Sequence, residues 1–117
     1  MIERAVFRLR DMKQSAQNIR ALLKGHTLET MYGDAVARAA FERFLEILSE
    51  ASRHVPTEWK QAAAPALPWR QIADLGNHIR HAYHKLDAEI LWNIYAEHLD
   101  ALEAAVDVMI ERHDPSL

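Results

Sequence analysis

The sequence predicts an all-α fold, an up-and-down bundle of four principal helices with an irregular, proline-rich connector before the third. Only three glycines and four prolines occur among 117 residues, so long stretches are free of helix breakers. Apolar residues recur at steps of three and four in these stretches, and no segment alternates as a strand does. The length suits a single domain, which we expect to span residues 1–117.

The first two helices are predicted from their apolar stripes and end signals. The first runs from about Ile2 to Leu23, and Gly25 follows where a left-handed residue often ends a helix. After a polar connector, Asp34 can cap a second helix that lasts to about Val55. The predicted apolar face of this second helix consists of Val36, Ala39, Ala40, Phe44, Ile47, Leu48 and Ala51.

The connector over residues 56–68 contains three prolines and cannot be one continuous helix. Thr57 is placed to cap a short helix within it, and Pro68 suits the first turn of a third helix. Asp87 is the expected N-cap of a fourth helix, which ends before Pro115. The inward face of the third helix is predicted to be Trp69, Ile72, Leu75 and Ile79.

Composition excludes several classes of protein. A net charge of −3 argues against a protein that coats nucleic acid by bulk attraction. The absence of cysteine excludes disulfides and thiolate metal sites, and it fits a reducing cytoplasm. No apolar run approaches the roughly 20 residues of a membrane span, and the N-terminus lacks the apolar block of a signal peptide. We therefore expect a cytoplasmic protein without a membrane partner.

The most informative segment is LGNHIRHAYHKLD, residues 75–87, which holds three of the seven histidines. On a helix, Asn77 and His81 share a face, with Arg80 on an adjoining edge. Tyr83 joins them if the chain is extended after the helix, because residues two apart then point the same way. Such a density of polar side chains is unnecessary for folding and indicates a functional site. The possible phosphate or rim contacts around it are His78, His84, Lys85 and Arg70.

These residue types indicate chemistry at a phosphodiester. The His81 imidazole can exchange a proton near neutral pH, the Arg80 guanidinium matches phosphate oxygens, and the Asn77 amide can orient the imidazole or stabilise negative charge. No carboxylate pair or nucleophilic serine arrangement competes with them. In RNA the 2′-hydroxyl is an internal nucleophile, so neither a metal ion nor a cofactor is required.

The chain resembles HepT-type proteins of the HEPN superfamily, ribonuclease toxins paired with a minimal nucleotidyltransferase (MNT) antitoxin. The resemblance extends over nearly the whole length, through FLEILSEASRHVP, PALPWRQI, GNHIRHAY and the helix around Trp92. The family motif is Arg-Asn, a short spacer, then His, any residue and Tyr; Asn77, His81 and Tyr83 fall on it. Gly76 stands where the family carries its arginine, and Arg80, four residues later, could reach the vacated space.

The resemblance implies a homodimer in which the motif helices of two subunits face each other across one composite cleft. It implies an endoribonuclease acting on tRNA or mRNA. It also implies that the MNT antitoxin silences the toxin by transferring AMP to Tyr83, where added bulk and negative charge would obstruct a substrate phosphate.

Other interpretations stay open from the sequence alone. Gly76 also fits a catalytically inactive helical subunit that docks a nucleotidyltransferase or a nucleotide, and a regulatory bundle without a ligand is a third possibility. His81 is equally compatible with a solvated helix end, and Tyr83 with a ring that covers the core. The spacing of His78, His81 and His84 only weakly suggests a metal site, because no carboxylate matches it.

Overall fold

The computed structural model describes residues 2–117, and the fold over that range is helical without any strand. It has four principal helical segments, two of which are interrupted, and two short helices in the connections. The elements are α1 (Ile2–Leu23), α2 (Leu28–Gly33), α3 (Ala35–Ser52), α4 (Thr57–Ala63), α5 (Trp69–Ala73), α6 (Leu75–Arg80), α7 (Lys85–Asn93), the π-helix η1 (Ile94–His98) and α8 (Leu99–His113). The predicted all-α bundle is thus confirmed.

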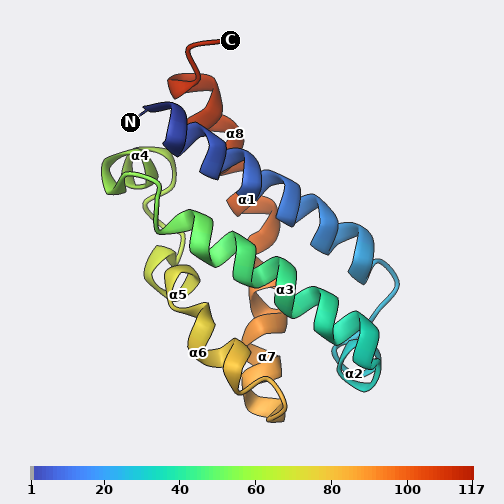
Figure 1. The fold of residues 1–117 in the computed structure, drawn as a ribbon. Helices are drawn as coiled ribbons and strands as arrows, with labels where there is room; N and C mark the ends of the chain where they lie inside the picture. The colour runs from blue at the N-terminus through green and yellow to red at the C-terminus, as the bar shows by residue number, and fades with distance from the viewer. Residues whose placement is uncertain (1) are drawn as a thin grey trace.

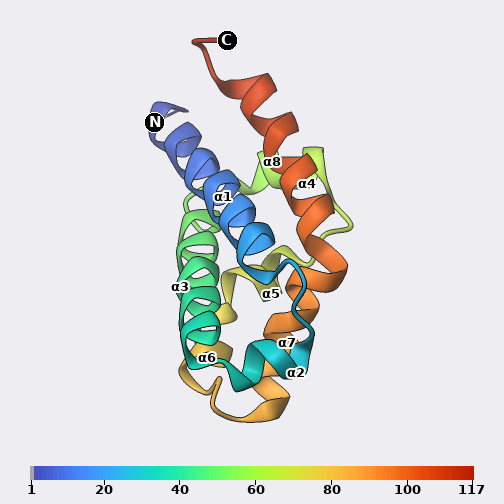
Figure 2. The ribbon, with the colours of Figure 1, turned by 90° about the vertical axis from the view of Figure 1, so that its right-hand side faces the viewer.

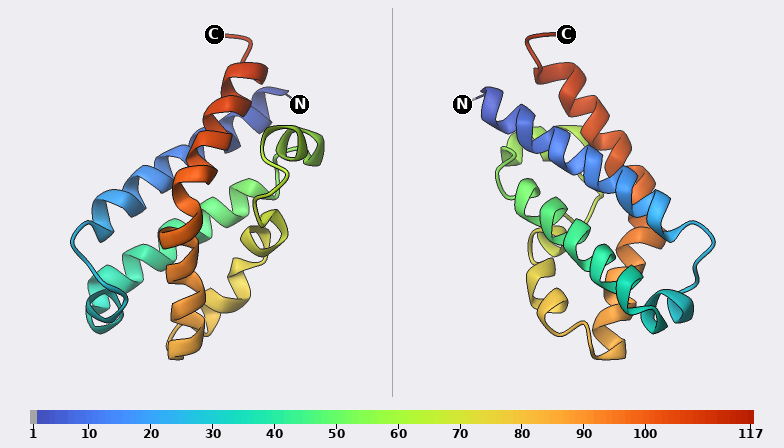
Figure 3. Two further views of the ribbon diagram at one scale, coloured as in Figure 1. Left: turned by 180° about the vertical axis from the view of Figure 1, so that it is seen from behind. Right: turned by 45° about the vertical axis from the view of Figure 1, so that its right-hand side comes forward.

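The bundle is assembled around an antiparallel pair, α1 and α3 (Figure 1). The segments α7, η1 and α8 form one long column behind this pair, and α5 and α6 run beside α3 in the opposite direction to that column (Figure 3). The column packs against α1 near the end where both termini lie (Figure 2). The side chains that fill the core include Leu9, Met12, Ile19, Phe41, Leu45, Leu48, Ile72, Leu75, Leu91, Ile94 and Leu102.

Both predicted end signals of the first two helices are confirmed. Gly25 has a φ of +84°, the left-handed conformation that ends α1. The Asp34 carboxylate accepts hydrogen bonds from the backbone N–H groups of Val36 and Ala37, both at 3.1 Å, and so caps α3. These short local bonds place the start of α3 against α2.

The predicted apolar face of α3 was rotated from the true one. The stripe that faces the core runs through Ala37, Phe41, Leu45 and Leu48, whereas Val36 is 80% exposed. Successive helical residues are turned by about 100°, so Val36 lies well off a stripe centred on Ala37. Leu48 and Ala51 are buried as predicted, so the helical period was right and the phase was only partly wrong, because hydrophobic residues occur on both sides of the buried stripe.

The predicted third helix is broken at Asp74. In a continuous helix the Asn77 N–H would donate to the Ala73 carbonyl, but here it donates to the Asp74 carbonyl at 3.3 Å. The Ala73 carbonyl instead accepts from the Ser49 hydroxyl at 3.1 Å and from the Arg53 guanidinium at 2.7 Å. Side chains of α3 therefore replace the helical bond and divide the segment into α5 and α6.

Three predicted helix starts were displaced by one to three residues. Pro56 and Pro68 are the N-caps of α4 and α5, so Thr57 and Trp69 are already helical. Asp87 does not cap the fourth helix, which begins at Lys85. The Asp87 carboxylate is bound to the ring of His78, which explains why it is not available as a cap.

Ion pairs hold the long column to α1. Arg20 on α1 bonds to Asp100 and Glu103, and Lys13 bonds to Asp107 at 2.6 Å. Hydrogen bonds with Glu103 and Asp100 raise the pKa of the Arg20 guanidinium above its ordinary value, although this group is always protonated in practice. Over the described residues, no helix is long and apolar enough to cross a membrane.

Replacing Asp34 by alanine should lower the free energy of unfolding by about 1 kcal/mol, because two N–H groups at the start of α3 lose their acceptor. Urea unfolding followed by circular dichroism measures the change. Asp34→Asn keeps a side-chain oxygen acceptor and should stay close to the unsubstituted protein. Equal midpoints for the alanine and asparagine variants would show that the cap contributes nothing.

Candidate functional site

The polar residues of the motif segment lie at the C-terminal end of α6 and in the turn after it. Asn77 and Arg80 are exposed on α6, and His81 is the exposed C-cap. Tyr83 is 63% exposed, so its ring does not cover the core. Among the described residues, the His81 ring has no hydrogen-bond partner in the protein, which leaves both ring nitrogens accessible to a ligand.

The Arg80 guanidinium lies over Gly76. A β-carbon added at Gly76 would stand 3.4 Å from Arg80 Nη1, and Arg80 Nη2 donates a hydrogen bond to Asn77 Oδ1. Gly76 has no positive φ, so its backbone does not require glycine. The side chain of residue 80 therefore occupies the space beside residue 76, and Asn77 holds it there.

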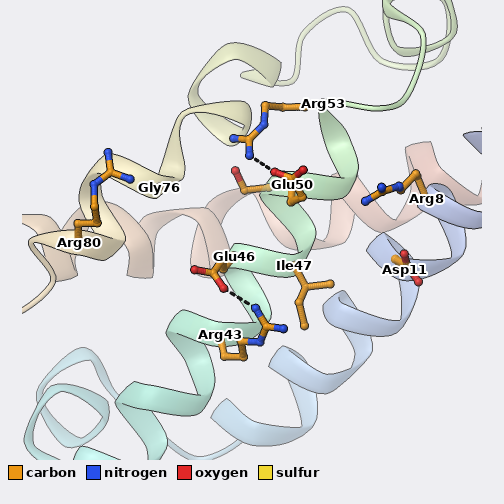
Figure 4. A pocket seen from close by; sticks show the side chains of 10 residues that line it. Arg8, Asp11, Arg43, Glu46, Ile47, Glu50, Arg53, Gly76 and Arg80 are labelled. Atoms are coloured by element: carbon orange, nitrogen blue, oxygen red, sulfur yellow. Dashed lines mark hydrogen bonds and ion pairs between the residues drawn. The ribbon is translucent and has the colours of Figure 1, made fainter.

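Two cavities meet at Gly76 and Arg80. The larger, about 490 Å³, lies between α1, α3 and α6 and contains the side chains of Arg8, Arg43 and Arg53 as well (Figure 4). The smaller, about 180 Å³, is lined by Arg53, Ala73, Asp74, Gly76, Asn77 and Arg80. Arginines from three helices thus border one continuous region around Arg80.

Acidic residues partly balance these arginines. Glu46 pairs with Arg43, and Glu50 pairs with Arg53 (Figure 4). Hydrogen bonds from His54 and Arg53 hold the pKa of the Glu50 carboxyl below its ordinary value, so it is charged at neutral pH. Arg80 differs from Arg43 and Arg53 because its hydrogen-bond partner, Asn77, is neutral.

Tyr83 reaches His81 through a turn and not through an extended segment. The His84 N–H donates to the His81 carbonyl at 2.9 Å, which bends the chain between them. The ring centroids of His81 and Tyr83 are 6.3 Å apart, and those of Tyr83 and His84 are 4.3 Å apart. The predicted neighbourhood of the two rings is therefore present, although the expected backbone conformation was wrong.

His78 has a bonding partner that the sequence analysis did not foresee. Its Nδ1 lies 2.8 Å from Asp87 Oδ1, and both side chains are mostly buried. This contact ties α6 to the first turn of α7. His78 thus bridges two helices, and its role as a phosphate or rim contact stays a prediction.

The other predicted rim residues are exposed but do not line either cavity at Gly76. Lys85 is the first residue of α7, and Arg70 projects from α5. His84 lies beside the Tyr83 ring. Over residues 2–117, no three His, Asp or Glu side chains are grouped as a metal site would require, so the three-histidine pattern does not assemble one.

A side chain of α2 supports the turn that carries Tyr83. The Tyr32 hydroxyl donates a hydrogen bond to the Tyr83 carbonyl at 2.5 Å, and the Arg38 guanidinium lies over the Tyr32 ring. No sequence signal connected residues 32 and 83, because they are brought together only by the packing of α2 against α7.

Comparison with known proteins identifies the family. Residues 12–109 match the HepT-like ribonuclease family model. The chain belongs to this family. The matched part of this HepT-like protein contains every polar residue of α6 as well as Arg43 and Arg53, whereas Arg8 lies before it.

Individual relatives agree with this membership. A probable ribonuclease HepT of Thermococcus cleftensis is 30% identical over 95 residues, which are 81% of this HepT-like chain and 86% of the relative. Two proteins named provisionally as RNases are similar at 29% and 28% identity. The first, from Caldanaerobacter subterraneus subsp. tengcongensis, is covered over 80% of its length, and the second, from Methanocaldococcus jannaschii, over 92%. No solved structure matches the chain significantly.

Replacing Tyr32 by phenylalanine in this HepT-like protein should loosen the turn at Tyr83, because the carbonyl there loses its only side-chain donor in the described structure. Hydrogen exchange at the amides of residues 81–84 should accelerate by about fivefold, the equivalent of one hydrogen bond of about 1 kcal/mol. Tyr95→Phe is the matched control, since no hydrogen bond of its hydroxyl supports the turn. Unchanged exchange in the Tyr32 variant would contradict the supporting role.

Proposed function

We propose that this HepT-like protein is an endoribonuclease that cleaves tRNA or mRNA in the cytoplasm without a metal ion, with Asn77, Arg80 and His81 as its catalytic residues. The observation that carries the proposal is the placement of the Arg80 guanidinium. It lies beside Gly76, is held by the neutral Asn77 amide, and lines an open cavity. His81, whose imidazole is exposed, is the next residue in the chain. Membership in a ribonuclease family supports the same reaction class.

In the proposed reaction the RNA supplies its own nucleophile. His81 accepts the proton of a 2′-hydroxyl, and the resulting oxygen attacks the adjacent phosphorus. The bond from phosphorus to the 5′-oxygen breaks, the leaving oxygen takes up a proton, and a 2′,3′-cyclic phosphate remains. Arg80 stabilises the charge on the non-bridging oxygens during this step, and Asn77 keeps the guanidinium in place.

The reaction needs a base and an acid, and one His81 imidazole cannot serve as both in the same step. We therefore propose a homodimer in which His81 of the partner subunit protonates the leaving oxygen. The α6–α7 turn and the start of α7 suit such a contact, since they expose Tyr83 (63%) and Leu86 (69%). Exposed apolar side chains next to polar catalytic groups are what a shared cleft requires.

We also propose that an MNT-type nucleotidyltransferase antitoxin silences the toxin by adenylylating Tyr83. Two observations support this residue as the acceptor. Its side chain is exposed to an incoming enzyme, and its ring lies 6.3 Å from that of His81. An AMP group there would place negative charge in the space that a substrate phosphate needs.

Substitution of the two proposed catalytic side chains should abolish cleavage. His81→Ala should lower the rate of tRNA or mRNA cleavage by about 10²- to 10⁴-fold through loss of the base. Arg80→Ala should lower it by about 10²- to 10³-fold through loss of charge stabilisation. Gel analysis of the RNA in buffer with EDTA measures both effects, and His98→Ala and Arg112→Ala are the matched controls. Cleavage that survives both substitutions would reject this site.

A double variant tests whether Arg80 replaces the arginine of the family motif. If the guanidinium matters by its position in space, Gly76→Arg combined with Arg80→Ala should recover much of the activity lost in Arg80→Ala. The vacated space beside residue 76 can then accept the new side chain. Absence of any RNA cleavage by the unsubstituted protein would instead favour the inactive binding subunit, an interpretation that Gly76 also permits.

Replacing Tyr83 by phenylalanine should remove the modification without removing catalysis. Incubation with a cognate MNT enzyme and ATP should add one AMP mass to the unsubstituted protein and none to Tyr83→Phe. The variant should go on cleaving RNA in the presence of the antitoxin and ATP. Tyr95→Phe is the control, and an AMP adduct on the Tyr83 variant would place the modification elsewhere.

A further inference from the structure

The strongest feature beyond the motif segment is Arg53, at the C-terminal end of α3. Its side chain is about half exposed. Nη1 donates to the Ala73 carbonyl at 2.7 Å, and Nη2 bonds to Glu50. The backbone bond holds the guanidinium at the point where α5 ends and α6 begins, far along the chain from the arginine itself.

This position makes Arg53 and Arg80 neighbours across one small cavity. Both guanidiniums line the 180 Å³ cavity together with Gly76 and Asn77. A water molecule takes about 30 Å³ in the liquid, so the space can hold a phosphate group with a few waters. A substrate phosphate bound there would meet arginines from two different helices.

The charges around the small cavity favour an anion. Two guanidiniums line it against one carboxylate, that of Asp74. Glu50 lines the larger cavity and not this one, but its bond to Arg53 offsets part of the charge of that arginine. An anion in the small cavity would therefore compete with Glu50 for Arg53, and removal of the Glu50 charge should strengthen its binding.

We infer that Arg53 binds the RNA phosphate next to the one that is cleaved at Arg80. The inference rests on the proposed ribonuclease function and gives Arg53 a role in substrate binding, not in the chemical step, beside its structural bond to the Ala73 carbonyl. A guanidinium anchored by a backbone carbonyl is already oriented, so little side-chain freedom is lost when the phosphate arrives. Glu50 bonds to the same guanidinium and thereby sets how strongly Arg53 binds the phosphate.

Two substitutions with opposite expected effects test the inference. Arg53→Gln keeps a donor for the Ala73 carbonyl but removes the charge; it should raise the KM for tRNA cleavage about tenfold and leave kcat nearly unchanged. Glu50→Gln should lower the KM, because it frees Arg53. Binding to a fluorescent single-stranded RNA with 2′-O-methyl groups, which cannot be cleaved, should change in parallel.

The salt dependence of this binding separates a phosphate contact from a purely structural role. The slope of log affinity against log salt should decrease by about 0.7 for Arg53→Gln, the value for one phosphate contact to a single strand. Arg53→Lys should keep most of the slope, and Arg112→Gln is the matched control. Circular dichroism and thermal unfolding establish that each variant is folded.

The outcomes distinguish the two proposals. If the protein cleaves tRNA but Arg53→Gln keeps the KM and the salt slope, the role of Arg53 is rejected and the proposed function stands. If the protein binds the methylated RNA without cleaving tRNA, the KM cannot be used. The effect of Arg53→Gln on the affinity for this RNA and on its salt slope then decides whether Arg53 binds a phosphate. If it neither binds nor cleaves RNA, both proposals are rejected.

Discussion

The geometry of the site depends on one carbonyl oxygen, that of Ala73. The side chains of Ser49 and Arg53 on α3 both donate hydrogen bonds to it. In a continuous helix its donor would be the Asn77 N–H, which here donates to the Asp74 carbonyl instead. Because backbone groups in a partly buried place need partners, these two side chains supply the bond that the break removes. The same contact fixes where α6 begins, and with it the direction in which Asn77 and Arg80 point. A site on a helix of only six residues is thus oriented by the long helix beneath it.

The linear sequence was sufficient for the parts of the structure that depend on near neighbours. The stripe of α1, the left-handed Gly25 and the Asp34 cap each involve residues within a few positions of one another. All three are as expected, except that Ile2 at the start of the stripe is exposed. The grouping of Asn77, Arg80 and His81 in one exposed segment follows for the same reason. Helical periodicity carries this information directly.

The polar contacts that were missed join residues of different elements. The bond from Tyr32 to the Tyr83 carbonyl spans 51 positions, and that from Arg53 to the Ala73 carbonyl spans 20. The pairing of His78 with Asp87 spans only nine positions, but it crosses a turn whose shape the sequence did not specify. Periodicity indicates which face of a helix is buried. It does not indicate which polar side chains of a neighbouring helix that face contacts. The cavity arginines of α1 and α3 escaped notice for that reason.

The wide turn η1 has a consequence for how this fold tolerates change in chain length. In the column formed by α7, η1 and α8, the buried residues Leu91 and Ile94 are three positions apart, as are Leu99 and Leu102. Ile94 and Leu99, at the two ends of the π-turn, are five positions apart. A π-turn absorbs this additional residue, so the two halves of the column keep their buried faces aligned. Loss of one residue within that turn would restore an ordinary α-helical repeat without rotating α8 against α1. The column thus contains a point at which a one-residue deletion is nearly silent, although everything around it is closely packed.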